Sequence, residues 1–280
     1  MPFSRIKSHA KLNLALNVIS KSKSLHNIES IISFVDLHDI ILIKKIKSKK
    51  HLISFNGKFS RKIGKKNTVS KLFEILENKK ILKNQRFQIK IKKSIPDKAG
   101  LGGGSMNAAS LLKYFIKKNN IKLNRNDIFK ISSKISSDTI LGLNKSSIIS
   151  KEMRIKYAKL KSPLHLILIK PDFGCSTKDI YSKVKNFSRT KLKLKSNKFL
   201  SLKFLSKLTN DLENPAFQKY PKLKKIKLFV EKLDNILFSR MSGSGSSIVL
   251  YLATKNNAKK AQKILKKKYK NYWCILSKTI

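Results

Sequence analysis

The sequence predicts an α+β fold with mainly antiparallel sheets, and three observations support this expectation. Apolar and polar residues alternate over residues 10–18, and a period of two is typical of strands. Apolar residues recur three and four positions apart over residues 69–76, which predicts a helix. The predicted strands and helices follow one another in an irregular order along the chain, and this irregularity favours antiparallel sheets.

The order of the predicted elements can be given for the whole chain. In the first half, strands are expected at residues 10–18, 40–46 and 87–93, and helices at residues 67–76, 105–118 and 126–138. In the second half, strands are expected at residues 164–169, 236–238, 248–252 and 272–276, and helices at residues 199–208, 223–233 and 257–268. The alternation at residues 10–18 predicts a half-buried strand on which Lys11 and Asn13 share one face, about 7 Å apart.

The composition limits the classes of function. The chain has 280 residues, of which 41% are hydrophobic and 28% charged, as is typical of a globular protein with a sizeable core. Its formal net charge of +49 raises nucleic acid or an anionic membrane as partners. Only seven basic residues are arginines, whereas nucleic-acid readers favour arginine. Lysines on a solvated surface are therefore the favoured interpretation, and a selected polyanion role is the alternative.

The sequence shows no disulfide, metal or membrane pattern. Cys175 and Cys274 form no CxxC pair and the five histidines form no HExxH spacing, so reduced core cysteines and no side-chain metal site are expected. The first seven residues lack the apolar run of a signal peptide. The longest apolar stretch, residues 163–169, is far below the roughly 20 residues of a membrane span. These features predict a soluble cytoplasmic protein without a membrane partner.

The most informative segment is the glycine-rich loop between the strand predicted at residues 87–93 and the helix predicted at residues 105–118. Its four glycines in five positions allow positive φ and let backbone N–H groups approach a ligand closely. The following helix adds unpaired N–H donors and the positive end of its dipole, so the loop suits polyphosphate. The loop has no Walker A order, and Ser105 stands where the dinucleotide pattern G-x-G-x-x-G needs its third glycine.

The order Pro-x-x-Ala-Gly-Leu-Gly-Gly-Gly-Ser at residues 96–105 resembles the ATP loop of the kinase superfamily that includes galactokinase, homoserine kinase and mevalonate kinase. Its triple glycine is most similar to one branch, the 4-diphosphocytidyl-2-C-methyl-D-erythritol kinases of non-mevalonate isoprenoid synthesis. Further segments match this branch in its order along the chain, namely residues 10–14, 25–30, 67, 138, 177–181, 210–213 and 241–245.

The resemblance implies a fold and an activity. The fold would be a two-lobed α+β kinase with its active site in the cleft between the lobes. Residues 1–155 would form the ATP-binding and catalytic domain and residues 156–280 the substrate-side domain, with the last strand free to return to the first lobe. The activity would be phosphorylation of the 2-hydroxyl of 4-diphosphocytidyl-2-C-methyl-D-erythritol by ATP with Mg²⁺. The substrate is thus a small cytidine diphosphate-linked polyol, no nucleic acid is expected, and the oligomeric state is not indicated.

The resemblance also implies roles for single residues. Lys11 and Asp138 would be the catalytic pair, in which the carboxylate orients the alcohol and accepts its proton and the ammonium offsets negative charge. The implied ATP-binding residues are Asn67, Pro96, Asp97, Lys98, Ala99, Gly100, Leu101, Gly102, Gly103, Gly104, Ser105 and Met106. The implied substrate-binding residues are Asn13, His26, Thr177, Tyr181, Gly243 and Gly245. Mg²⁺ would be held mainly by phosphates and water, with Ser105 as a candidate protein ligand.

The departures from the branch pattern lie mainly on the acceptor side. Leu25 replaces the tyrosine that would stack on one face of the cytosine, and stacking contributes about 1–3 kcal/mol per base. Residues 136–140 read Ser-Ser-Asp-Thr-Ile, where the branch has Gly-Ala/Ser-Asp-Val-Pro. The residues that would fix the turn around Asp138 have therefore changed, and a displaced turn would lower the transfer rate steeply.

Two other interpretations remain open. A kinase of the same superfamily could take a mevalonate- or homoserine-type acceptor, although residues 210–213 and the cytidine-side residues favour the first interpretation. A non-catalytic basic RNA-binding protein would have arginine and aromatic residues gathered on one face. The lysines instead run along the whole chain, which makes this the least favoured interpretation.

Overall fold

The computed structural model describes residues 2–22, 25–118, 121–143, 148–151, 154–189, 192 and 199–280. Its contacts divide the chain into two compact units. The first unit comprises Met1–Lys11, Leu37–Asp97 and Gly102–Lys145, and the second comprises Leu12–Asp36, Lys98–Leu101 and Ser146–Ile280. The strands β1 (Ser4–Ser22) and β2 (Leu25–Ile46) contribute residues to both units. The functional division at residue 155 stays a prediction.

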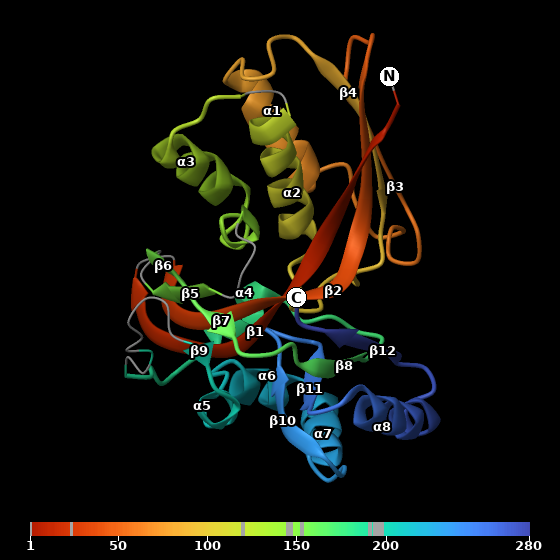
Figure 1. The fold of residues 1–280 in the computed structure, drawn as a ribbon. Helices are drawn as coiled ribbons and strands as arrows, with labels where there is room; N and C mark the ends of the chain where they lie inside the picture. Colours follow the sequence, from red (N-terminus) through yellow and green to blue (C-terminus); the bar gives the residue numbers. More distant parts are fainter. Residues whose placement is uncertain are drawn as a thin grey trace. The chain divides into compact units, whose positions relative to one another are not determined.

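The first unit is a β-sheet with helices on one face (Figure 1). β4 (Arg86–Lys92) pairs antiparallel with β2 and parallel with β3 (Leu52–Asn56), and β1 pairs with β2. The helices of this unit are α1 (Thr68–Asn78), α2 (Gly103–Lys118) and α3 (Arg125–Ile135), and a short 3₁₀ turn, η1 (Leu141–Leu143), follows α3.

Apolar residues of the strands and helices form one core in the first unit. Ile89 and Ile91 of β4 are fully buried and belong to the same cluster as Leu72 of α1 and Leu111 of α2. Burying an isoleucine or leucine side chain contributes roughly 1.5–3 kcal/mol. The core therefore fixes the position of α2, and with it the residues of the glycine loop that lead into this helix.

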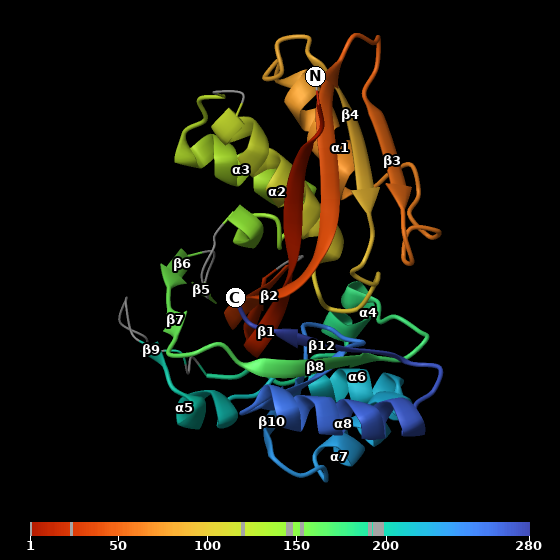
Figure 2. The same cartoon turned by 45° about the vertical axis from the view of Figure 1, so that its right-hand side comes forward.

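The second unit is built on an antiparallel sheet in the order β10-β11-β8-β12. Its strands are β8 (His165–Lys170), β10 (Ile236–Met241), β11 (Ile248–Leu252) and β12 (Trp273–Lys278). The helices α6 (Glu213–Lys219), α7 (Pro221–Val230) and α8 (Lys255–Lys268) cover one face of this sheet (Figure 2). The shorter elements are β5 (Ile148–Lys151), β6 (Arg154–Tyr157), β7 (Lys159–Leu160), α4 (Thr177–Ser182), β9 (Phe199–Leu200) and α5 (Leu202–Ser206).

The predicted α+β class and the predominance of antiparallel pairing are confirmed. Several elements have different bounds from those expected. β1 extends beyond residues 10–18 at both ends, and β10 continues to Met241 rather than ending at residue 238. β2 begins at Leu25 rather than at residue 40, α3 ends at Ile135 rather than near residue 138, and the helix expected at residues 199–208 is a short strand followed by α5. Six short elements are not predicted at all, because none shows a clear period, namely β3, β5, β6, β7, α4 and α6.

The strand expected at residues 10–18 is confirmed as part of β1, but the expectation that it is half-buried is wrong. Lys11, Asn13 and Asn17 are buried together with the apolar residues of the opposite face. Alternation predicts a solvated polar face only when the polar residues lack partners inside the protein. Here Lys11 meets Asp138, and the Asn13 side chain donates to Ser30.

Candidate active site

Lys11 and Asp138 are far apart in the sequence and meet in the first unit. The Nζ atom of Lys11 lies 3.2 Å from Oδ2 of Asp138. The lysine side chain is only 6% exposed, whereas the aspartate side chain is 33% exposed. The carboxylate is therefore the member of the pair that a ligand can reach, and the ammonium supports it from the interior.

Asp138 lies in a tight turn that begins where α3 ends. The N–H of Thr139 donates to the carbonyl of Ser136, and the N–H of Leu141 donates to the carbonyl of Asp138, both at 3.2 Å. The hydroxyl of Ser136 lies 2.7 Å from Oγ1 of Thr139 and donates to Oγ of Ser105 at 2.8 Å. The turn is thus held by hydrogen bonds, although the glycine and proline of the family pattern are absent.

Gly102 brings the glycine loop onto the Lys11–Asp138 pair. Its φ is +67°, and a Cβ at this position would lie 2.9 Å from Cγ of Lys11 and 3.7 Å from Oδ2 of Asp138. Glycine alone fits here without strain. Its carbonyl accepts the N–H of Met106, and α2 begins at Gly103. The N–H groups of the first turn of α2, which begins directly after Gly102, have no partner within the helix.

Asn67 caps α1, and the protein itself uses its side chain. Its Oδ1 accepts the N–H groups of Val69 and Ser70 at 3.0 Å, and its Nδ2 donates to two backbone carbonyls of the preceding loop. The next residue, Thr68, donates to the carbonyl of Gly104 at 2.7 Å. This cap ties the start of α1 to the glycine loop, while a direct contact of Asn67 with a nucleotide stays a prediction.

Sequence reasoning missed a buried carboxylate at the base of the loop. Asp39 is fully buried and forms an ion pair with Lys93. It also accepts the N–H groups of Ser94 at 2.7 Å and Ile95 at 2.9 Å, and the side-chain amide of Asn107 at 3.0 Å. Asp39 therefore connects the segment before the loop to α2. The only sequence signal was the scarcity of acidic residues, 15 in the chain, because no local motif marks Asp39.

Residues 98–101 of the loop pack within the second unit. The carbonyl of Lys98 accepts the N–H of Cys175 at 3.2 Å, and the carbonyl of Gly100 accepts the hydroxyl of Ser242 at 3.0 Å. The φ of Gly100 is +75°, and a Cβ there would clash with the carbonyl oxygen of Ser242.

Most of the predicted ATP-binding residues are accessible. The exposed or half-buried ones are Asn67, Asp97, Lys98, Gly100, Gly102, Gly103, Gly104 and Ser105, and the buried ones are Pro96, Ala99, Leu101 and Met106.

Three residues predicted for the acceptor side, namely His26, Tyr181 and Thr177, make side-chain contacts within the second unit. The rings of His26 and Tyr181 have their centroids 5.0 Å apart, at an angle of 42°. Burial lowers the pKa of His26, with a smaller contribution from Lys21, so the neutral imidazole offers one donor and one acceptor nitrogen. Oγ1 of Thr177 lies 2.9 Å from Oγ of Ser244.

The remaining acceptor-side residues are held by hydrogen bonds of the same unit. The side-chain amide of Asn13 donates to Oγ of Ser30 at 2.8 Å. The side-chain amide of Asn210 donates to the carbonyl of Gly243 at 2.8 Å, and Gly245 has a φ of +89°. In the sequence, Asn210 is only one residue of a family motif. In the structure, its side-chain amide also donates to the carbonyl of Met241 and so holds the turn that contains Gly243.

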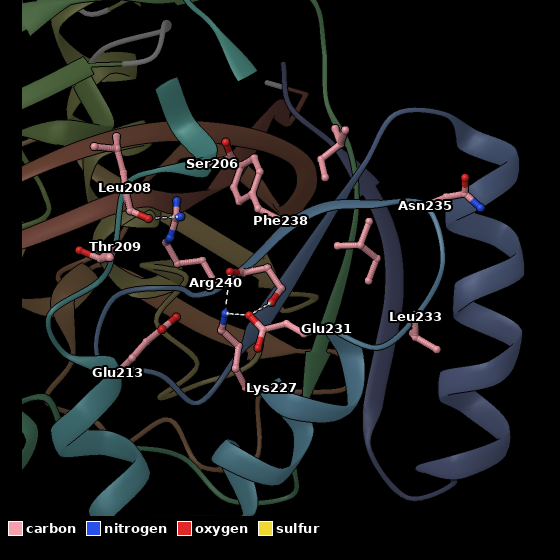
Figure 3. Close-up of a pocket in the computed structure, with 13 residues that line it drawn as sticks. Ser206, Leu208, Thr209, Glu213, Lys227, Glu231, Leu233, Asn235, Phe238 and Arg240 are labelled. Atoms are coloured by element: carbon pink, nitrogen blue, oxygen red, sulfur yellow. Dashed lines mark hydrogen bonds and ion pairs between the residues drawn. The ribbon is translucent and has the colours of Figure 1, made fainter. Parts of the chain in front are cut away.

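The second unit also contains a cavity of about 400 Å³, and the residues that line it lie between positions 206 and 240 of the chain (Figure 3). None of the predicted site residues lines it. The ammonium of Lys227 contacts Glu231 and donates to the carbonyl of Ser239 at 2.9 Å. The guanidinium of Arg240 donates to backbone carbonyls of three residues. The charges of this cavity are therefore engaged by the protein itself.

The structure shows neither a metal centre nor a membrane span among the residues that it describes. No three His, Cys, Asp or Glu side chains lie together there in a way that could hold a metal ion. The prediction of reduced core cysteines is confirmed, since Cys175 and Cys274 are buried free thiols and burial raises the pKa of each to about 11. No helix in that part of the chain is long and apolar enough to cross a membrane.

Comparison with known proteins finds similar sequences over the whole chain. The family model of the GHMP kinases N terminal domain matches residues 67–147, and that of the GHMP kinases C terminal domain matches residues 195–271. A 4-diphosphocytidyl-2-C-methyl-D-erythritol kinase of Pelagibacter ubique (strain HTCC1062) is 54% identical over 277 residues, which is 99% of each chain. A kinase of the same name from Caldanaerobacter subterraneus subsp. tengcongensis is 33% identical and covers 87% of this chain and 86% of its own.

Solved structures share the fold. A crystal structure of 4-(cytidine 5'-diphospho)-2C-methyl-D-erythritol kinase matches with a TM-score of 0.78 at 22% identity, covering 99% of this chain and all of the other. A homoserine kinase from Cytophaga hutchinsonii matches with a TM-score of 0.71 at 15% identity, covering 100% of this chain and 95% of its own. At these identities the structural match establishes the fold alone.

Proposed function

The chain belongs to the GHMP kinases, and within them to the 4-diphosphocytidyl-2-C-methyl-D-erythritol kinase family, and from this premise we propose that it transfers the γ-phosphoryl group of ATP to the 2-hydroxyl of 4-diphosphocytidyl-2-C-methyl-D-erythritol. This acceptor is an intermediate of non-mevalonate isoprenoid synthesis. The observation that carries the proposal is the Lys11–Asp138 pair beside Gly102 of the glycine loop. Phosphoryl transfer needs a proton acceptor, a cation and a phosphate-binding backbone in one place.

The pair divides the work of transfer between its two members. Asp138 orients the 2-hydroxyl and accepts its proton as the oxygen bonds to the γ-phosphorus and the bond to ADP breaks. Lys11 offsets the negative charge on the transferred group. The buried position of the lysine and the partial exposure of the carboxylate support this division, because only the carboxylate needs to reach the alcohol.

The glycine loop is assigned to ATP. Gly102 and Gly103 lead into the first turn of α2, whose N–H groups suit phosphate oxygens. The described residues hold no cluster of metal ligands, which fits a Mg²⁺ ion held mainly by phosphates and water with Ser105 as its protein ligand. When bound, Mg²⁺ would neutralise charge on the phosphates. We place the reaction in the cytoplasm, where ATP is supplied, and expect no nucleic-acid partner.

The acceptor side is assigned to residues of the second unit. Asn13 and Thr177 are proposed for the polyol hydroxyls, His26 and Tyr181 for cytosine, and Gly243 and Gly245 for the diphosphate. The ring contact of His26 with Tyr181 supports the cytosine assignment, since a base can stack on one ring and bond to the other. The side chain of Leu25, which replaces the family's tyrosine, lies outside the described part of the structure.

The test is a comparison of acceptors. The purified chain is given magnesium–ATP with 4-diphosphocytidyl-2-C-methyl-D-erythritol, mevalonate or homoserine, and ADP and phosphorylated product are measured. We expect transfer to the first acceptor only. Transfer to another acceptor alone, or no transfer although ATP binds, would refute the proposal.

A variant tests the cytosine assignment in the same assay. Tyr181→Ala is expected to raise the KM for the cytidine substrate about 5-fold to 150-fold, as the loss of one stacking contact predicts, and to leave the KM for ATP unchanged. Tyr272→Ala, a half-buried tyrosine of the same unit, is the control. Equal shifts in the two variants would remove the assignment.

A further inference from the structure

We propose that Ser136 and Thr139 are positioning residues, whose hydroxyl groups hold the Asp138 turn to the glycine-loop helix α2 through Ser105. Ser136 stands at the glycine of the family pattern and Thr139 at its valine, so the device belongs to this chain rather than to the pattern. The inference rests on the phosphoryl transfer proposed above.

The hydrogen bonds of these hydroxyls have a single direction. A serine or threonine hydroxyl has one hydrogen to donate. Ser136 donates its hydrogen to Ser105 at 2.8 Å. The hydrogen in the 2.7 Å contact between Ser136 and Thr139 must therefore come from Thr139. The three hydroxyls form a chain that runs from Thr139 through Ser136 to Ser105.

The end of this chain lies where the phosphates are expected. Thr139 is fully buried, so its hydroxyl does not bond to bulk water. Ser105 accepts the hydrogen bond from Ser136, so the hydrogen of its own hydroxyl is not used within the chain of hydroxyls. It lies in the first turn of α2, where the helix favours anions. Linked hydroxyls polarise one another, so the chain makes the Ser105 hydroxyl a better donor to a phosphate oxygen.

The start of the chain fixes the backbone around Asp138. Ser136 and Thr139 stand on either side of Ser137 and Asp138, and they are joined both by their hydroxyls and by the N–H of Thr139 donating to the carbonyl of Ser136. In the family pattern, a proline at position 140 restricts φ, and here Ile140 cannot. The hydroxyl contact supplies the missing restriction and keeps Asp138 within 3.2 Å of Lys11.

The first test is Ser136→Ala. We expect kcat to fall about tenfold or more, because a small displacement of a catalytic group is costly, while the KM for the acceptor stays nearly unchanged. The matched control is Ser133→Ala in the last turn of α3, just before Ser136. Ser133 is exposed and its hydroxyl donates to the carbonyl of Lys130, so this variant should behave as the parent chain. Unchanged kcat in Ser136→Ala, or an equal loss in the control, would overturn the proposal.

A double-mutant cycle separates positioning from a general structural effect. If Ser136 acts through Ser105, the double variant Ser105→Ala with Ser136→Ala is no slower than Ser105→Ala alone. Restoring the family pattern with Ser136→Gly, Thr139→Val and Ile140→Pro should recover much of the rate lost by Ser136→Ala. Additive losses in the cycle, without recovery in the triple variant, would contradict the proposal.

A readout without the acceptor keeps this inference apart from the proposed function. Amide hydrogen exchange at Thr139 and Leu141 should quicken in Ser136→Ala and stay at the parent rate in Ser133→Ala. Should Ser136→Ala not fold, Thr139→Val, which lacks the hydroxyl, is compared with Thr139→Ser, which keeps it. If the parent chain phosphorylates no acceptor, the proposed function fails, whereas equal exchange in all variants refutes the positioning role.

Discussion

Two lysine–carboxylate pairs, one in each unit, are similar in isolation and differ in their surroundings. The Lys11 and Lys227 side chains are 6% and 12% exposed, and their partners Asp138 and Glu231 are both partly exposed. The Lys227–Glu231 pair borders a cavity (Figure 3). Lys227 donates to the carbonyl of Ser239, and the hydroxyl of Ser239 donates to Glu231. The Lys11 pair lies instead beside Gly102 of the glycine loop, where an added Cβ would be 2.9 Å from Cγ of Lys11.

Both pairs are partly buried ion pairs, so burial and charge alone do not distinguish the proposed site. The first pair is distinguished by Gly102, whose φ is positive and where an added Cβ would approach Lys11, and by the helix that begins at the next residue. The N–H groups in the first turn of a helix suit phosphate, whereas Lys227 and Glu231 of the second pair are already bonded to Ser239.

Replacing Lys11, but not Lys227, is expected to have a large effect on catalysis. Lys11→Met should lower kcat about 10²-fold to 10³-fold, because a preorganised charge beside the transferred group is lost. Lys227→Met should leave kcat nearly unchanged. Steady-state rates at saturating magnesium–ATP and acceptor decide the matter, and similar losses in both variants would erase the distinction between the pairs.

A third pair in the first unit should matter for stability. Asp39→Asn leaves the ammonium of Lys93, 6% exposed, without its buried counter-charge, and should lower the free energy of unfolding by about 3 kcal/mol. Urea unfolding measures this loss. Adding Lys93→Met should recover part of it, because the unpaired charge is then removed. A single variant as stable as the parent would show that the buried pair does not support the loop.

The glycine loop itself is tested by Gly102→Ala. The backbone at this position has a φ of +67°, which is strained for alanine, and the added Cβ would lie 2.9 Å from Cγ of Lys11. We therefore expect kcat to fall about tenfold. Gly64→Ala is the control, since a Cβ there meets nothing within 4 Å. Rates are compared with the affinity for magnesium–ATP. Normal activity in Gly102→Ala would mean that the loop can retreat from the pair without cost.

The smallest effect concerns the charges near the second pair. Burial raises the pKa of Glu213 above its ordinary value of 4.5, against the smaller opposing effect of Lys227. Between pH 4.5 and the raised pKa, the folded chain therefore binds a proton at Glu213 that the unfolded chain does not. The contribution of this group to the free energy of unfolding is fully present below pH 4.5 and is lost as the pH rises through the raised pKa. Glu213→Gln stays neutral, so its stability relative to the parent should rise with pH.

Urea unfolding of the parent chain and Glu213→Gln from pH 4.5 to pH 8 measures this change. A difference that stays constant, or that falls with pH, would contradict the burial argument. In either case kcat should be unaffected, in keeping with a structural role for these charges.

The sequence predicted those parts of the molecule that local patterns determine. The recurrence of apolar residues three and four positions apart predicted α1, and the alternation at residues 87–93 predicted β4 with bounds that differ by one residue from those observed. Resemblance to a known family paired Lys11 with Asp138, and the structure does bring them together. Periodicity alone could not have done so, because nothing local relates a lysine on a strand to an aspartate after a distant helix.

What the sequence could not show depends on contacts between distant segments. Asp39 has no motif, and its importance follows only from Lys93, Ser94 and Asn107 meeting around it. The burial of Asn13 was misjudged because its partner, Ser30, lies on another strand. The hydroxyls of Ser136 and Thr139 counted in the sequence only as a departure from the family pattern.

The most direct test of the account is a single-turnover measurement on Asp138→Asn. Magnesium–ATP affinity and the rate of γ-phosphoryl transfer to 4-diphosphocytidyl-2-C-methyl-D-erythritol are measured on the same preparation, beside Asp234→Asn, an exposed aspartate, as the control. The account predicts ATP binding close to that of the parent chain and a transfer rate lower by about 10²-fold to 10⁴-fold. Transfer at the parent rate, or a loss of transfer that merely follows a loss of ATP binding, would contradict it.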